Sequence, residues 1–221
     1  MRTLSLPLAL TARISPVLVL AGAGWALTSG PAATPAVQKD PTPQSAAESP
    51  SGTSTAAAVK QYAAAPAPCA SMSAATIKSL VPGAKTAGKE IPSTDTALRR
   101  TCSWNALKGY DYRWLDVSFE ITESAEAAAK SYKENISEKS GGGSVPGVGD
   151  AGYSVVNLAT EDKQQTREGV VMIQASNALV TVTYNGSDFE SKKAPSTDEI
   201  NKGAIKAAKE AVAALEGGQK A

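Results

Sequence analysis

The sequence predicts an α+β domain, in which an antiparallel sheet of four to five strands carries helices on one face and is closed by one disulfide. Three observations predict this class. Apolar residues alternate with polar ones over 115–121, which is the period of a half-buried strand. They recur at helical spacing over 124–139 and 197–216. Strand-like segments follow one another directly, which favours antiparallel pairing over a parallel α/β arrangement.

The strand candidates lie between positions 102 and 185. Leu115, Val117, Phe119 and Ile121 define the clearest one, with Asp116 between them on the polar face. The full set of candidates is 102–107, 115–121, 153–158, 168–175 and 179–185. The last two are separated by Ser176-Asn177 and a few flanking residues, so they are expected to form a hairpin.

Three helices are expected from periodicity and capping. A short helix over 73–81 has Ser73 as its cap and ends at Pro82-Gly83. The segment 124–139 has acidic residues near its start and Lys139 at its end, which complements the helix dipole. The third helix, over 197–216, is capped by Ser196 or Thr197. A glycine-rich loop over 140–152 separates the second helix from the later strands.

The chain divides into four parts by composition. Residues 1–27 place arginines ahead of a 14-residue uncharged run, and we expect either a signal peptide or an N-terminal membrane anchor. Residues 28–68 contain 31 Ala, Pro, Ser, Thr or Gly among 41 and predict a disordered linker. Residues 69–217 have the composition of a single folded domain, and 218–221 form a flexible tail.

Two cysteines, Cys69 and Cys102, are the whole thiol inventory. An even pair in an exported chain favours a disulfide between them. A reactive thiol or a metal ligand is the alternative, but no CxxC spacing or cluster of ligands accompanies either cysteine. No metal site and no cofactor are expected.

Composition also limits the function. The chain has no histidine, which removes Ser-His-Asp and Cys-His catalysis and the commonest general base. Positions 69–217 hold 17 basic and 19 acidic residues, a net charge of 17 − 19 = −2, which argues against nucleic-acid binding. Membrane contact is expected only through residues 1–27, if they are not cleaved.

Two motifs resemble catalytic or cofactor sites but have structural interpretations. Residues 147–152 match G-x-G-x-x-G, yet a loop precedes them and a strand follows, whereas a dinucleotide site needs a strand before and a helix after. Asp116 and Glu120 share one strand face, but they are about 13 Å apart, too far for a glycosidase pair. We interpret the first motif as a turn and the second as a solvated face.

Three short segments carry a family resemblance. Pro68-Cys69 before a short helix, Cys102-Ser103-Trp104 on a strand and a Gly-Val-Gly-Asp-Ala turn at 147–151 resemble a family of exported, often lipid-anchored, envelope proteins of high-GC Gram-positive bacteria, known as a domain of unknown function. More distantly, the chain resembles the extracellular sensor domains of bacterial receptor Ser/Thr kinases. The resemblance implies an extracytoplasmic α+β domain with a Cys69–Cys102 bridge over about 67–217. The lipid-bearing cysteine common in that family is missing.

We therefore expect a non-catalytic extracytoplasmic envelope protein, either anchored to the membrane or secreted, that binds a ligand or a partner or acts as a sensor. Four aromatic residues are close together and are the candidate contacts: Trp104, Tyr110, Tyr112 and Trp114. Any one of them can instead belong to the core. The alternatives are a structural component of the envelope and a histidine-free extracytoplasmic hydrolase.

Overall fold

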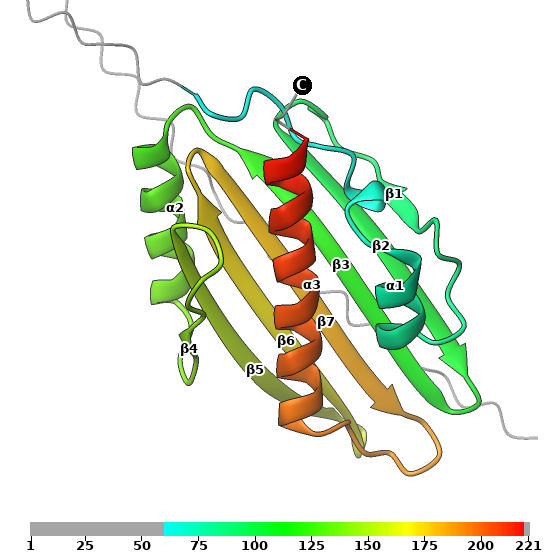
Figure 1. Cartoon of the computed structure of the whole chain (residues 1–221). Coiled ribbons are helices and arrows are strands. Elements are labelled where there is room, and N and C mark those ends of the chain that lie inside the picture. The colour runs from blue at the N-terminus through cyan, green and yellow to red at the C-terminus, as the bar shows by residue number, and fades with distance from the viewer. Residues whose placement is uncertain (1–59, 219–221) are drawn as a thin grey trace, which may run out of the picture. The chain divides into compact units, whose positions relative to one another are not determined.

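The computed structural model describes residues 60–218 (Figure 1). The expected signal peptide or anchor at 1–27, positions 28–59 of the expected linker and the last residues of the expected tail lie outside this range. In chain order the elements are η1 (Pro68–Ala70), α1 (Ala74–Leu80), β1 (Lys89–Ile91), β2 (Arg99–Lys108), β3 (Asp111–Ile121), α2 (Ala125–Ser137), β4 (Gly143–Ser144), β5 (Ala151–Glu161), β6 (Gln164–Ala175), β7 (Ala178–Asp188) and α3 (Thr197–Gly217).

All described strands form one antiparallel sheet in the order β1-β2-β3-β7-β6-β5-β4. The prediction of four to five strands is wrong, because the sheet has seven. The two additional strands, β1 and β4, have three and two residues and lie at the two edges. Strands this short contain no apolar alternation that a sequence pattern could reveal. The five predicted strands are all present, and most are longer than expected.

Helix α3 lies across the middle of the sheet, with α1 beside it on the same face (Figure 1). The main core fills the space between these helices and the sheet. Its largest fully buried side chains include Phe119 and Leu115 of β3, Ile173 of β6 and Ile200 of α3. Alternate residues of β3 and β7 point into it, since Val117 faces Val182 and Phe119 faces Val180 in the antiparallel register.

Helix α2 packs on the opposite face of the sheet, so the prediction that the helices share one face is also wrong. Its Ala128 and Tyr132 form a separate buried cluster with Met172 of β6 and Leu179 of β7. In each strand the neighbouring residues, such as Ile173 and Val180, point to the main core. Because successive side chains of a strand alternate between faces, α2 and α3 cover opposite faces of β6 and β7.

The packed chain begins before Cys69. Tyr62 is 1 % exposed and belongs to the main core, although it lies in the segment 28–68 expected as linker. The buried side chain of Asn177, in the β6–β7 turn, holds it in place. The Asn177 Oδ1 accepts from the Tyr62 backbone N–H at 2.9 Å, and its Nδ2 donates to the Tyr62 carbonyl at 2.9 Å.

The predicted disulfide is present between Cys69 and Cys102, with their Cα atoms 5.1 Å apart. Cys102 is fully buried on β2, and Cys69 lies in η1. The bond fixes the segment before α1 to the interior of the sheet. Disulfides of this kind persist in oxidising compartments, which agrees with an extracytoplasmic location. Among residues 60–218, no helix is long and apolar enough to cross a membrane.

Candidate functional site

The four aromatic candidates are divided by the sheet. Trp104 is 2 % exposed and lies in the main core, and its indole N–H donates to the Thr86 carbonyl at 3.1 Å. It is therefore unavailable to a partner. Trp104 is two residues after Cys102 on β2, so both side chains point to the same buried face.

Tyr112 and Trp114 point to the other face of the sheet, where no helix among residues 60–218 covers β2 and β3. Trp114 is 38 % exposed. Its indole N–H donates to Ser103 Oγ at 2.8 Å and to Asp116 Oδ1 at 2.7 Å, which fixes the ring across the strands. Asp116 therefore positions this tryptophan, and Glu120 lies 3.8 Å from Arg99 in an exposed ion pair. The two carboxylates do not converge on a common site.

One end of the sheet gathers exposed hydrophobic side chains. Leu107 lies directly opposite Tyr112 in the β2–β3 register, and the Tyr112 ring centroid is 6.0 Å from that of Phe189. The Phe189 N–H donates to the Tyr110 carbonyl at 2.9 Å, which brings the β2–β3 turn against the segment after β7. We call this surface the aromatic end; it comprises Leu107, Tyr110, Tyr112, Trp114 and Phe189.

The aromatic end concentrates the apolar surface of the domain. Seven large hydrophobic side chains are exposed among residues 60–218, and four of them belong to it, namely Leu107, Tyr110, Trp114 and Phe189. Isolated exposed hydrophobic residues are ordinary, but a contiguous group of them marks an interaction surface. Tyr and Trp are also enriched where proteins bind partners, because a large ring is buried there at a small loss of conformational entropy.

The aromatic end and Tyr62 lie at opposite ends of the strands. Tyr62 contacts Asn177 in the β6–β7 turn, beside the end of β3 at Ile121, while Tyr110 precedes the start of β3 at Asp111. Eleven residues of β3 separate these ends, a length of about 33 Å. Helix α3 also finishes at the Tyr62 end, since Glu216 in its last turn lines the same pocket as Tyr62. The chain thus joins the domain at one end and presents its exposed aromatic residues at the other.

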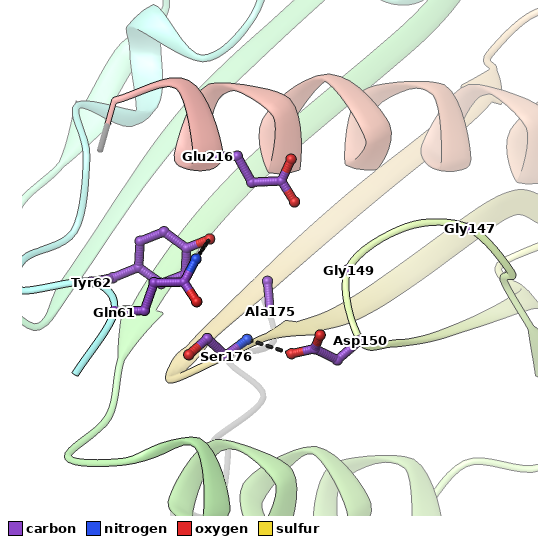
Figure 2. A pocket seen from close by; sticks show the side chains of 8 residues that line it. All are labelled: Gln61, Tyr62, Gly147, Gly149, Asp150, Ala175, Ser176 and Glu216. Atoms are coloured by element: carbon purple, nitrogen blue, oxygen red, sulfur yellow. Dashed lines mark hydrogen bonds between the residues drawn. The ribbon is translucent and has the colours of Figure 1, made fainter. Parts of the chain in front are cut away.

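A pocket of about 410 Å³ lies at the Tyr62 end (Figure 2). Its walls come from the chain before η1, the loop before β5, the β6–β7 turn and the last turn of α3. The lining residues are Gln61, Tyr62, Gly147, Gly149, Asp150, Ala175, Ser176 and Glu216. The Asp150 carboxylate accepts from the Ser176 N–H at 2.6 Å, as Figure 2 shows, so this group already serves to join the loop to the turn.

The charged side chains that line this pocket are the carboxylates of Asp150 and Glu216, so the pocket is negatively charged. Burial raises the pKa of the Tyr62 phenol, and the nearby carboxylates of Glu216 and Asp150 raise it further. An acidic, open pocket repels phosphates and other anions. Within residues 60–218, no three His, Cys, Asp or Glu side chains are grouped so that they could hold a metal ion.

The glycine motif at 147–152 forms part of this pocket and is a turn, as we interpreted it. Gly147 and Gly149 have φ of +72° and +59°, values that glycine adopts without strain. The motif leads into strand β5 and not into a helix. A Cβ on Gly149 would lie 2.5 Å from the Gln174 carbonyl oxygen, so this glycine also allows the loop to pack against β6.

Two members of the aromatic end, Leu107 and Phe189, were not predicted from the sequence. Leu107 falls at the end of a predicted strand, and its exposure depends on which face of that strand is covered. Phe189 lies 77 positions after Tyr112 and reaches it only because β3 and β7 are neighbours in the sheet. Only the strand order of the sheet brings Phe189 to Tyr112, and that order was not predicted from the sequence.

No protein-family model matches the chain, and no curated protein matches it. One solved structure, of a protein from Bacteroides thetaiotaomicron VPI-5482, is similar with a TM-score of 0.32 and 10 % sequence identity. The likeness covers 50 % of this chain and 50 % of that one, so the chain spans half of that protein's length. A TM-score and a sequence identity this low indicate neither a shared fold nor a shared function.

Proposed function

We propose that this chain is a non-catalytic extracytoplasmic envelope protein that binds a macromolecular partner through the aromatic end. The observation that carries the proposal is the gathering of Leu107, Tyr110, Tyr112, Trp114 and Phe189 toward the end of the strands opposite to Tyr62, where the chain joins the domain. A tether at Tyr62 would hold this surface away from the membrane or wall. The disulfide and the resemblance to exported envelope proteins support the location.

The shape of the surface supports an extended partner over a small ligand. Ligand pockets enclose most of a small molecule, whereas the aromatic end lies on an open sheet face and on a turn. Trp114 is also fixed by its two hydrogen bonds, so little side-chain freedom would be lost when a partner covers it. Ser103, Asn105 and Asp116 beside it supply a polar rim around the apolar centre.

Co-sedimentation of the full chain with isolated envelope material tests the proposal. The probes are cell-wall sacculi and membrane vesicles prepared from a high-GC Gram-positive bacterium, and the measured quantity is the dissociation constant. We expect binding to one of them that the double substitution Trp114→Ala and Phe189→Ala weakens about tenfold or more, because large aromatic residues dominate interface energetics.

Leu98→Ala is the matched control, since Leu98 is 45 % exposed but lies outside the aromatic end. This variant should bind as the wild type does. Melting temperatures of both variants establish that the fold is retained. Equal binding by the double variant and the wild type, or no binding of the wild type to either probe, would overturn the proposal.

A further inference from the structure

The outer edge of β5 is long and, in the part of the chain that the structure describes, mostly without a partner strand. Strand β4 pairs with β5 only at Tyr153 and Ser154, and no other described strand follows it in the sheet. Residues 155–161 of β5 therefore pair with β6 on one side and with nothing among residues 60–218 on the other. Leu158, in the middle of this edge, is 49 % exposed.

The hydrogen bonds of β4 identify which backbone groups face outward. The Val145 N–H donates to the Gly152 carbonyl at 2.8 Å, so the peptide groups of Gly152 point away from β6. Pairing with β6 continues without a break from Ala151 to Glu161. Because the direction alternates along an antiparallel strand, the N–H and C=O groups of Val156, Leu158 and Thr160 also point outward.

This edge lacks the features that normally prevent pairing with another chain. Natural edge strands are kept short or carry charges, prolines or bulges. Positions 155–160 read Val-Val-Asn-Leu-Ala-Thr, and the first charge is Glu161. The opposite edge of the same sheet has such protection, since β1 has three residues, begins at Lys89 and is followed by Pro92.

We propose that the free edge of β5 pairs antiparallel with the same edge of a second copy of this chain, about a twofold axis midway between the two copies of Leu158. The two sheets then continue into one. Leu158 lies opposite Leu158 of the second copy, Val156 lies opposite Thr160, and Thr160 lies opposite Val156. Each of these three pairs exchanges two backbone hydrogen bonds, which makes six.

Only this register pairs the outward backbone groups of all three residues, Val156, Leu158 and Thr160. A twofold axis perpendicular to the sheet must lie midway between the two copies of one residue, because paired residues lie on the same face and neighbouring positions of a strand lie on opposite faces. An axis between the two copies of Asn157 would place Thr160 opposite Ser154, where β4 already pairs. An axis between the two copies of Ala159 would place Val156 opposite Asp162 in the β5–β6 turn. Either alternative forms only two of the three pairs.

The side chains are also compatible with self-pairing. Leu158 of each copy would cover the exposed surface of the other, with Cβ atoms about 5 Å apart. Glu161, the only charged residue in 155–161, would lie opposite Val155, so no like charges face each other. This interface does not include the aromatic end, which is built from β2, β3 and the segment after β7, and it is independent of the proposed function.

Sedimentation velocity of the full chain in a mild detergent tests the pairing, and sedimentation equilibrium yields the dissociation constant. We expect a reversible dimer whose population rises with protein concentration. Leu158→Lys puts two ammonium groups opposite each other at the axis and should weaken dimerisation about tenfold or more. Leu98→Lys is the matched control and should dimerise as the wild type does. Circular dichroism verifies that both variants remain folded.

A second variant tests the register. Leu158→Cys places two thiols across the axis at a Cα separation of about 5.5 Å, which a disulfide can span. Mild oxidation should link this variant into a covalent dimer and leave Leu98→Cys monomeric on a non-reducing gel. A wild type that remains monomeric at all concentrations, or a dimer that Leu158→Lys leaves intact and Leu158→Cys does not link, would overturn the proposal.

Discussion

Tyr184 of β7 joins the sheet to the last residue of α1 through a single buried hydroxyl. Its side chain is 3 % exposed, and its O–H donates to the Leu80 carbonyl at 2.7 Å. Burial raises the pKa of this phenol to about 12; the Arg113 charge opposes the shift, and Glu199 and Asp111 add to it. In the unfolded chain, the phenol titrates near its ordinary value of about 10.

These pKa values predict a loss of stability in alkali. Between pH about 10 and 12 the unfolded chain releases the Tyr184 proton while the folded chain keeps it, so the free energy of unfolding falls by roughly 2–3 kcal/mol from this group. Tyr184→Phe should be less stable than the wild type by about 1 kcal/mol at pH 8, because the hydrogen bond is lost. By pH 12 that difference should have reversed in urea unfolding, with Tyr184→Phe the more stable by about 1–2 kcal/mol, because the variant has no phenol to ionise. A difference that stays constant over this range would contradict the assignment.

Single residues also set the limit of what the sequence predicts about the site. The spacing of Tyr112 and Trp114 places both on one strand face, and both are at the surface as candidate contacts require. Trp104 also lies on a strand, but its side chain points to the buried face. A shift of one position along a strand decides between the core and the solvent. Cys102, two positions earlier, could have indicated this. A disulfide cysteine buried on one face of β2 implies that every second residue of that strand, including Trp104, points to the same buried face.

At the scale of elements, the contact of α3 with the sheet depends on two glycines that let backbones approach. A Cβ on Gly203 of α3 would lie 2.6 Å from the Tyr184 ring, and one on Gly169 of β6 would lie 2.8 Å from the Ile200 side chain. Neither ring nor side chain can move freely, because both are buried. The helix thus sits closer to β6 and β7 than larger residues would allow.

Gly203→Ala should therefore destabilise the protein, although alanine favours helices over glycine by about 1 kcal/mol. Overpacking costs about 1–3 kcal/mol, so the expected net loss in the free energy of unfolding is up to about 2 kcal/mol. Gly217→Ala, in the same helix but with open space around it, is the matched control and should be neutral or slightly stabilising. Urea unfolding measures both. A Gly203→Ala protein as stable as the control would show that α3 packs less tightly than described.

Element type was predictable where the pattern was long. Each of the three helices begins at a serine whose hydroxyl accepts a backbone N–H, and the sequence indicated these caps at Ser73 and Ser196. The side of the sheet that α2 covers was predicted wrongly, because all helices were expected on one face. A signal existed, since Val170–Ile173 is apolar without alternation, which is typical of a strand buried on both faces. The short edge strands β1 and β4 carry no comparable signal.

At the scale of the whole molecule, the disulfide closes a long loop of the chain and so contributes to the stability of the fold. The bond joins residues 33 positions apart, and α1 and β1 both lie inside that loop. Replacing both cysteines by alanine should lower the free energy of unfolding by about 3–4 kcal/mol, because the unfolded chain regains the freedom that closure removes. Urea unfolding with and without reductant measures the effect. The double variant should not respond to reductant, and a wild type equally indifferent to it would contradict the prediction.

The start of the folded domain lies earlier than the composition of the sequence predicted, because Tyr62 already belongs to the core. An Ala- and Pro-rich segment gives no apolar pattern, yet Tyr62 and Ala65 of this segment belong to the main core, and Tyr62 makes two hydrogen bonds to Asn177. Its partner Asn177 is 115 positions away in a turn, where asparagine is common for local reasons. Long-range hydrogen bonds of this kind follow from the tertiary fold and not from local sequence.

The position of the disulfide also determines how the domain would carry a mechanical load. Tension applied through the chain before Tyr62 reaches Cys69 and then crosses the covalent bond directly to Cys102 in β2. The stretch between the two cysteines, with α1 and β1, lies outside this load path. Its extended length of roughly 110–120 Å would stay stored even after the rest of the domain had been pulled open. Reduction of one bond would release this reserve, so the redox state of the surroundings would set the maximum reach of a stretched molecule.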